Sequence, residues 1–343
     1  MKRISRRDFL RTAGIGLTSI VAQQFLSACG VRPSEDNPMP TAPNEVNFLQ
    51  TATPFSPIQD QSTSTSVPTT ETPYPYLVVS RGTQPEEMVR QGVKVLGGME
   101  RFMKPGADVI IKPNICVPYN SYEYAATTNP WVVGALVKIC LEAGAKRVRV
   151  MDYPFGGSGE ECYRTSGIEE QVTAAGGSME VMHPIKYVDK QIIGALRLKK
   201  VAVYQDILNA DLLINVPIAK DHGLARLTLG LKNLMGTIQK REKIHVSFES
   251  SLVDLATLVR PQLTIIDAIR TLMANGPTGG SLSDVKIQNT LIISPDIVAA
   301  DSYATSLFGM TPHHIPYIIK AAERGLGKAD LSGLKIQEIN ANA

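Results

Sequence analysis

The sequence predicts an α/β protein: a doubly wound, mostly parallel sheet with helices on both faces. Short apolar runs rich in β-branched residues recur along residues 77–343. Their near-continuous hydrophobicity is typical of strands that are buried on both faces. Segments with helical spacing of apolar residues alternate with these runs. The composition, 43% hydrophobic and 20% charged over 343 residues, is that of a globular protein.

Each apolar run is a predicted strand, at residues 77–80, 108–112, 147–152, 211–216, 263–267 and 290–294. The clearest helix begins after Thr128 and Asn129, with Pro130 in its first turn, and ends at Gly144. It places apolar residues on one face, at Val132, Ala135, Leu136 and Ile139. Further helices are predicted at residues 85–96, 168–175, 248–259, 297–308 and 315–324. A small inserted lobe is expected around residues 183–205.

Charge and cysteine usage exclude several classes of protein. Residues 1–28 hold five basic residues and one acid, so the rest of the chain carries a formal charge of −1. This balance gives no support for nucleic-acid binding, and we expect no nucleic-acid partner. The cysteines at 29, 116, 140 and 162 form no C-x-x-C pair. We therefore expect no zinc ribbon and no cysteine-ligated iron–sulfur cluster.

Residues 1–28 are typical of an export signal and stand apart from the fold. Residues 5–10 read Ser-Arg-Arg-Asp-Phe-Leu, a twin-arginine signature. The uncharged stretch 13–26 is too short to span a bilayer core of about 30 Å. It leads into Leu-Ser-Ala-Cys, which resembles the lipoprotein box in which Cys29 is lipidated. The alternative is an uncleaved N-terminal anchor with a chance cysteine.

We therefore expect an extracytoplasmic protein that is anchored to the cell membrane by a lipid on Cys29, with the twin-arginine export machinery as a partner. Residues 29–76 are predicted to form a disordered tether behind that lipid. Of the 46 residues from 31 to 76, 22 are Pro, Ser or Thr, and Arg32 is the only basic residue. Such a segment buries too little apolar area to offset the entropy of ordering it. Residues 77–343 then form the α/β domain.

Polar residues follow four of the predicted strands, where ligands bind in open parallel sheets. The candidates are Lys112, Asn114, Asp152, Lys220, His222 and Asp267. Each also has a structural explanation: Lys112 as a solvated strand-end charge, and Asp152 and Asp267 as helix caps or turn formers. The loop 156–159, Gly-Gly-Ser-Gly, resembles an anion cradle but lacks the ending of a nucleotide-binding loop.

Histidine supplies the sharpest candidate. His222 lies two residues from Lys220, where an imidazole serves as general acid, general base or metal ligand. The alternative is a hydrogen-bonded structural histidine. His245, beside the basic run 240–243, is a second candidate, whereas His313 and His314 read as surface residues. The cysteines after Cys29 are too scattered for a metal site, and Cys140 falls in the apolar pattern of a helix.

Several of these residues fall in ordered sequence blocks that resemble the bacterial and archaeal family called domain of unknown function 362. The blocks cover most of residues 77–340, at 111–114, 128–145, 215–223, 229–236 with His245, 259–267, Asp301 and 322–327. The resemblance implies a set of site members: Lys112, Asn114, Lys220, His222, Lys232, Asn233, His245 and Asp267. It implies no ligand. Some relatives carry ferredoxin-like cysteine runs, which this chain lacks, so a redox function does not carry over.

Together these observations predict a cationic pocket in an exported, lipid-anchored enzyme. Lys112, Lys220 and Lys232 would hold an anionic small molecule such as a carboxylate or phosphate. His222 would move a proton, and Asp267 would orient it or hold a metal. Two other functions remain open. One is a non-catalytic binding or scaffold lipoprotein, and the other is a redox protein loaded with a flavin or metal before export.

Overall fold

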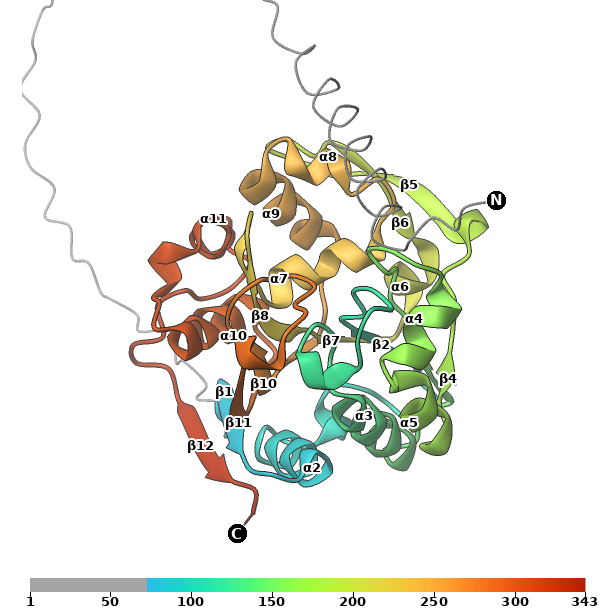
Figure 1. Cartoon of the computed structure of the whole chain (residues 1–343), viewed down its shortest axis with the longest axis vertical. Helices are drawn as coiled ribbons and strands as arrows, with labels where there is room; N and C mark the ends of the chain where they lie inside the picture. The colour runs from blue at the N-terminus through green and yellow to red at the C-terminus, as the bar shows by residue number, and fades with distance from the viewer. Residues whose placement is uncertain (1–72, 343) are drawn as a thin grey trace, which may run out of the picture. The chain divides into compact units, whose positions relative to one another are not determined.

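The computed structural model describes residues 73–342 of the chain. Among these residues, one ten-stranded sheet forms the centre of the body (Figure 1). Its main path follows the order β12 (Ile336–Asn340), β1 (Leu77–Arg81), β11 (Val285–Ser294), β10 (Leu263–Leu272), β7 (Leu212–Val216), β2 (Asp108–Pro113), β3 (Arg147–Val150) and β4 (Ser178–Met179). The predicted runs all become strands of this sheet.

Most neighbouring strands are parallel, which confirms the predicted fold class. Strands β10, β7, β2, β3 and β4 form a continuous parallel block. Strand β11 is antiparallel to both β10 and β1, whereas β12 is parallel to β1. Because two reversals restore the direction, β1 runs the same way as the parallel block. The carboxyl ends of β2, β3 and β7 therefore meet at one edge, where ligands bind in folds of this kind.

After β7 the chain passes Pro217 and continues as another strand. Strand β8 (Ile218–His222) pairs with the later part of β10, and with β9 (Arg226–Thr228) in a hairpin. Lys220 and His222, expected after the end of the strand 211–216, therefore lie on a further strand and not on a loop. Ile218 and Ala219 are fully buried and extend the sheet past Pro217. The two site candidates are thus held on a paired strand.

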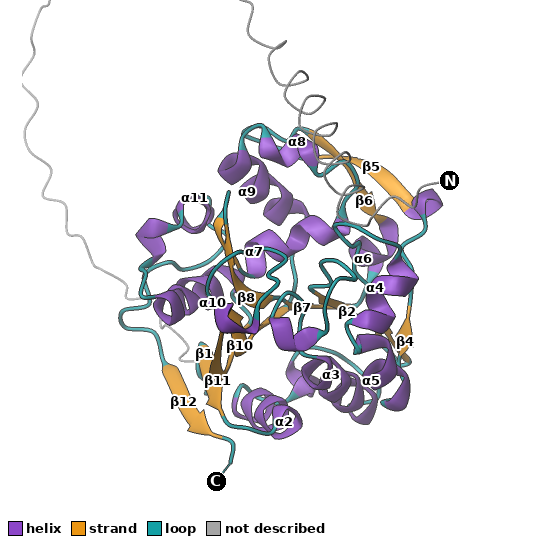
Figure 2. Ribbon diagram, in the orientation of Figure 1, coloured by secondary structure: helices purple, strands orange, loops and turns teal. Residues whose placement is uncertain are grey.

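Helices cover both faces of the sheet (Figure 2). One face carries α2 (Pro85–Val95), α3 (Pro130–Glu142), α4 (Gly159–Thr165) and α5 (Ile168–Ala174). The other carries α6 (Gln205–Asn209), α7 (Gly230–Asn233), α8 (Glu242–His245), α9 (Phe248–Leu258), α10 (Ile297–Ala304) and α11 (Pro316–Glu323). Val109 and Ile111 of β2 pack with the first set, and Ile110 between them packs with the second. This alternation is what burial on both faces requires.

Helix α3 begins as predicted. The Asn129 side chain accepts a hydrogen bond from the backbone N–H of Trp131, and Pro130 occupies the first turn. The predicted helix 297–308 is shorter than expected: α10 ends at Ala304, and residues 305–308 continue as a 3-10 turn. The start of α3 is thus predicted correctly because its cap, Asn129, and its first-turn proline, Pro130, are both visible in the sequence.

The expected insertion around residues 183–205 is a two-stranded antiparallel sheet of β5 (Tyr187–Gln191) and β6 (Lys200–Tyr204). Val201 and Val203 are buried in the same apolar cluster as α9 and α10. The inserted sheet thus packs onto the body.

The predicted signal and most of the predicted tether lie outside the described residues. Residues 73–76 are described, and Tyr76 is bonded to the body: its hydroxyl donates to Asp296 Oδ2 at 2.5 Å, and its backbone N–H donates to the Lys335 carbonyl at 2.7 Å. Within residues 73–342, no helix has the length and hydrophobicity needed to cross a membrane.

Candidate functional site

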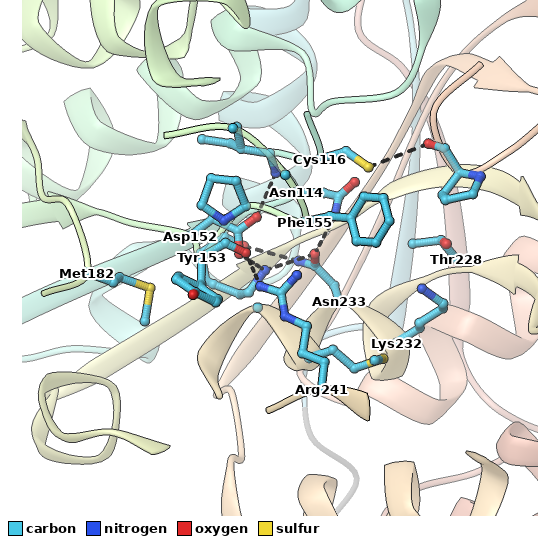
Figure 3. Close-up of a pocket in the computed structure, with 18 of the residues that line it drawn as sticks. Asn114, Cys116, Asp152, Tyr153, Phe155, Met182, Thr228, Lys232, Asn233 and Arg241 are labelled. Carbon is cyan, nitrogen blue, oxygen red and sulfur yellow. Dashed lines mark hydrogen bonds and ion pairs between the residues drawn. The ribbon is translucent and has the colours of Figure 1, made fainter. Parts of the chain in front are cut away.

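A cavity of about 750 Å³ lies at the carboxyl edge of the parallel strands (Figure 3). The residues discussed below come from the end of β2, the loop after β3, the β8–β9 hairpin, helix α7 and helix α8. Helix α4, residues 181–182 and Pro277 complete the lining. Its volume lies within the range of small-molecule sites. Of the predicted site residues, all but Asp267 line it: Lys112, Asn114, Asp152, Lys220, His222, Lys232, Asn233 and His245.

Lys112 and Asp152 form a buried ion pair at the base of the cavity. Lys112 Nζ lies 2.7 Å from Asp152 Oδ1, and both side chains are almost fully buried. Lys112 Nζ also donates to the Pro113 carbonyl at 2.8 Å and to Asn233 Oδ1 at 3.0 Å. Burial lowers the pKa of Lys112 to about 8, while Asp152 opposes that shift, so most of this lysine is charged at neutral pH. Burial also raises the pKa of Asp152, and the charge of Lys112 opposes that shift.

Asn233 connects this ion pair to the rest of the sheet. Its Oδ1 accepts from Asn114 Nδ2 at 3.1 Å, and its Nδ2 donates to Asn215 Oδ1 at 2.8 Å. Asp152 also bonds to the backbone, because its Oδ2 accepts a hydrogen bond from the N–H of Ile115 at 2.7 Å. Lys112, Asp152 and Asn233 form what we call the bonded wall of the cavity, and Asn215 supports it from within the sheet.

The tight turn of residues 229–236 brings α7 against the bonded wall. Asp301 fixes the start of α7, because its carboxylate oxygens accept from the backbone N–H groups of Gly230 and Leu231 at 2.6 and 2.9 Å. At the other end, a Cβ on Gly236 would meet Asp152 Oδ1 and lie 2.6 Å from Lys112 Nζ. Glycine at this position therefore lets the backbone approach the ion pair.

Lys220 has fewer partners than Lys112. Its Nζ donates to the carbonyls of Ala126 and Pro277 at 2.7 and 2.9 Å. Burial lowers the pKa of Lys220, and the nearby Cys116 opposes that shift. The Sγ of Cys116 also contacts the Pro277 carbonyl, at 3.7 Å. The two carbonyls and the Cys116 side chain are therefore all partners of the Lys220 ammonium.

Lys232 has no hydrogen-bond or ion-pair partner among residues 73–342, although it lines the cavity (Figure 3). Burial lowers the pKa of Lys232 to about 7, and the positive charges of Lys220, Arg241 and Lys112 add to this effect, with Cys116 opposing it. At neutral pH a large fraction of this side chain is therefore the neutral amine.

His222 is held by the hairpin that follows it. Its Nδ1 accepts from the backbone N–H groups of Leu224 and Ala225, at 3.1 and 3.2 Å. Burial lowers the pKa of His222 to about 3, with further lowering by the charges of Lys232 and Lys220. The ring is thus neutral at pH 7, and its single proton lies on Nε2. A neutral His222 donates a hydrogen bond from Nε2 rather than acting as an imidazolium acid.

The structure places Asp267 away from the cavity lining. Its Oδ2 accepts from the backbone N–H of Asn129 at 2.7 Å, and its Oδ1 accepts from that of Ile269 at 3.0 Å. The expectation that Asp267 orients His222 is corrected, since the backbone of the hairpin does so. The reason is that β10 runs on to Leu272, so Asp267 sits inside a strand and not at its end. Asp267 has a structural role instead: it holds the backbone of Asn129, the residue whose side chain caps α3.

The remaining candidates have clear places. The glycine loop 156–159 contributes to the lining, and Ser158 caps α4 through the Glu161 backbone N–H at 3.1 Å. His314 Nδ1 is bonded to Thr311 and lies outside the lining, as expected for a surface residue. Among residues 73–342, no three His, Cys, Asp or Glu side chains have the arrangement needed to hold a metal.

Some lining residues were not singled out from the sequence. Arg241 lies 5.0 Å above the Tyr153 ring and donates to the Tyr153 carbonyl. Four buried polar atoms of the lining have no hydrogen-bond partner among the described residues: Asn114 Oδ1, Thr228 Oγ1, Arg241 Nε, and Asp152 Oδ1, which is ion-paired with Lys112. The basic run 240–243 was a signal for Arg241, whereas nothing local marks Thr228 or Cys116. Lys232, His222 and Thr228 form what we call the open wall.

The lining is strongly cationic in a chain that is close to neutral. It contains five basic side chains, Lys112, Lys220, Lys232, Lys240 and Arg241, and two acidic ones, Asp152 and Glu242. Gathering like charges raises the free energy of the fold unless an anion compensates them. The fold and this cavity define an α/β protein with a cation-rich pocket at the carboxyl edge of its sheet.

The chain belongs to the family described as Domain of unknown function (DUF362), whose model matches residues 109–306. A relative from Synechocystis sp. (strain ATCC 27184 / PCC 6803 / Kazusa), "Thylakoid-associated protein sll1697", is 32% identical over 249 residues, which are 70% of this chain and 74% of the relative. The resemblance inferred from the sequence blocks is confirmed.

Two solved structures overlap with this chain in part. The lactate racemase apoprotein from Thermoanaerobacterium thermosaccharolyticum has a TM-score of 0.40 at 12% identity, over 64% of this chain and 54% of that chain. A protein from Thermotoga maritima has a TM-score of 0.36 at 12% identity, over 66% of this chain and 60% of that chain. In both cases this chain covers less than two thirds of the solved one.

Proposed function

We propose that this protein is an exported, lipid-anchored enzyme that binds an anionic small molecule, a carboxylate or a phosphate, in the cation-rich cavity. The observation that carries the proposal is Lys232, a cavity lysine without a carboxylate partner among the described residues. An anion bound beside Lys232 favours the charged form of this lysine and offsets the repulsion from Lys220, Arg241 and Lys112. The unbonded Asn114 Oδ1 and Thr228 Oγ1 supply further polar contacts for the ligand.

Two features favour catalysis over simple capture of a ligand. His222 has one fixed tautomer, and Lys232 is an amine that gains or loses a proton near neutral pH. Groups whose pKa is shifted toward the working pH are common in active sites, because proton transfer is then efficient. A non-catalytic binding lipoprotein is the alternative, and it predicts binding without turnover.

Binding to inorganic phosphate and to propionate, measured by isothermal titration calorimetry, tests the anion site. Lys232→Met should weaken binding by about 1–3 kcal/mol, because a charge-assisted hydrogen bond is lost. Lys104→Met, at an exposed lysine outside the lining, is the matched control and should bind like the unchanged protein. If neither anion binds, or if both variants bind equally well, the proposal fails.

The export and anchoring part of the proposal rests on Arg6, Arg7 and Cys29, with a relative that is named for its association with thylakoids. Intact-mass analysis of membrane material should show a lipid on Cys29 as the first residue. Cys29→Ala should abolish that modification. Replacing both Arg6 and Arg7 by Lys should block export, because Lys lacks the planar guanidinium group. An unmodified Cys29 in mature membrane-bound protein would refute the anchor.

A further inference from the structure

The three lysines of the cavity differ in how many of their N–H groups are used. Lys112 Nζ donates two hydrogen bonds and is ion-paired with Asp152, and Lys220 Nζ donates two hydrogen bonds and contacts the Cys116 side chain. Lys232 Nζ has no such partner among residues 73–342. An ammonium that is fully bonded serves as a fixed charge and is not available to react. Lys232 is therefore the one of these three whose nitrogen is free to contact a ligand directly.

The surroundings of Lys232 favour its neutral form. Lys220, Arg241 and Lys112 place positive charge around it, and burial removes water from its ammonium group. A neutral amine has a lone pair and is a nucleophile, and lysines beside other cations are a known route to such amines. The charges of Lys220, Arg241 and Lys112 thus lower the pKa of Lys232 to about 7, where part of the side chain is the free amine.

The open wall also suits a ligand that carries a carbonyl group beside its anionic group. His222 has a neutral ring with a proton on Nε2, which is a donor for a carbonyl oxygen. The Thr228 hydroxyl, on the neighbouring β9, is buried and unbonded among the described residues. Lys220 and Arg241 are the charges that attract a carboxylate or phosphate. A simple anion-binding site has no need of a neutral amine among its donors.

We propose that Lys232 forms a Schiff base with the carbonyl carbon of an anionic oxo compound, such as a small oxo acid, bound in this cavity. This inference rests on the proposed function and names its substrate class. In the step, Nζ forms a C=N bond and the carbonyl oxygen leaves as water with the two hydrogens of the amine. No electrons are transferred, so no oxidant or reductant is required. His222 and Thr228 would position the departing oxygen.

The test uses glyoxylate, a small anionic aldehyde, with sodium cyanoborohydride to reduce any imine to a stable secondary amine. The intact chain is labelled, and peptide mapping by mass spectrometry gives the labelling rate of each lysine. At pH 7, Lys232 should react more than about tenfold faster than the exposed Lys104, because burial and the neighbouring cations lower the pKa of Lys232. The rate at Lys232 should level off above about pH 7 to 8.

Variants separate this inference from the proposed function. Lys232→Gln should remove the fast phase, and Lys104→Gln should leave it unchanged. Labelling of Lys232 at no more than the rate of Lys104 would overturn the Schiff base, whatever the natural substrate is. If propionate binds in calorimetry but Lys232 labels slowly, anion binding stands and only the covalent step is refuted. If propionate and phosphate do not bind while Lys232 labels fast, the reactive amine stands and the anion site is refuted.

Discussion

The bonded wall and the open wall of the cavity each hold a lysine, and the two lysines differ in their partners. On the bonded wall, Lys112 is ion-paired with Asp152 and donates two hydrogen bonds, and Asp152 also accepts from a backbone N–H. On the open wall, Lys232 has no partner among residues 73–342, and Thr228 Oγ1 is unbonded there too. A lysine in a pocket is thus not by itself a ligand contact. Its hydrogen-bond count decides whether it holds the fold or meets the ligand.

The largest expected effect comes from breaking the bonded wall. Lys112→Met leaves the Asp152 carboxylate buried without its cation, and we expect a loss of about 3–5 kcal/mol in the free energy of unfolding. Chemical denaturation measures it. A double variant, Lys112→Met with Asp152→Asn, should recover part of the loss because no buried charge remains. An unchanged stability in the single variant would show that this ion pair is not structural.

Gly236→Ala tests the close approach of the backbone to the same pair. The added Cβ would meet Asp152 Oδ1 and crowd Lys112 Nζ, so we expect a loss of about 1–3 kcal/mol, as for other overpacked sites. Gly223→Ala is the matched control, because a Cβ there would have no atom within 4 Å. Equal stability of the two variants would contradict the close packing of α7 on the bonded wall.

Lys232→Met should raise the stability of the fold below pH 7, whereas the two variants above lower it. The pKa of Lys232 is about 7 in the folded protein and 10.5 as the ordinary value. Between these pH values the unfolded chain binds more protons, so the stability of the unchanged protein rises with pH across this window. The methionine variant lacks that dependence. It should melt above the unchanged protein below pH 7, and the gap should close as the pH approaches 10.

A lower melting temperature of Lys232→Met at pH 6 would mean that Lys232 stabilises the fold like Lys112. Melting curves of both proteins at pH 6, 8 and 10 distinguish the two outcomes. An added anion that binds the cavity should also reverse the gap, because it raises the stability of the unchanged protein by mass action.

The smallest effect on stability is expected at His222. His222→Ala removes the acceptor for two backbone N–H groups of a partly exposed hairpin, which costs about 1 kcal/mol. His222→Asn should restore part of this, because its side-chain oxygen is also an acceptor. Denaturation measures stability, and glyoxylate labelling of Lys232 measures the site. A loss of several kcal/mol in His222→Ala would make this histidine a structural one.

Local sequence predicts where site residues gather better than what each of them does. Lys112 and Asp152 follow buried strands, and the parallel topology brings strand ends to one edge. The difference between Lys112 and Lys232 depends on Asn233, which lies 121 positions from Lys112 and one from Lys232. A pattern of neighbouring residues does not predict a contact between positions so far apart in the sequence.

Asp267 is the opposite case, a residue that the sequence assigns to the site and that the structure places outside the cavity lining. Its carboxylate is bonded to the Asn129 backbone, 138 positions away. The sequence places it at the end of an apolar run, which is the usual position of a site residue in this fold class. The run continues through Ala268 and Ile269 into a longer strand, so the residue is buried in the sheet. The β8 extension was missed for a related reason, because Pro217 reads as a strand end.

The direction of β1 separates the start of the body from its cavity. Leu77 starts β1, and β1 runs parallel to β10, β7 and β2, so the chain enters the sheet at its amino edge. The cavity lies at the opposite, carboxyl edge. The entry of the chain into the sheet and the lining of the cavity are therefore built from opposite ends of the same strands, so that a change at one need not disturb the other.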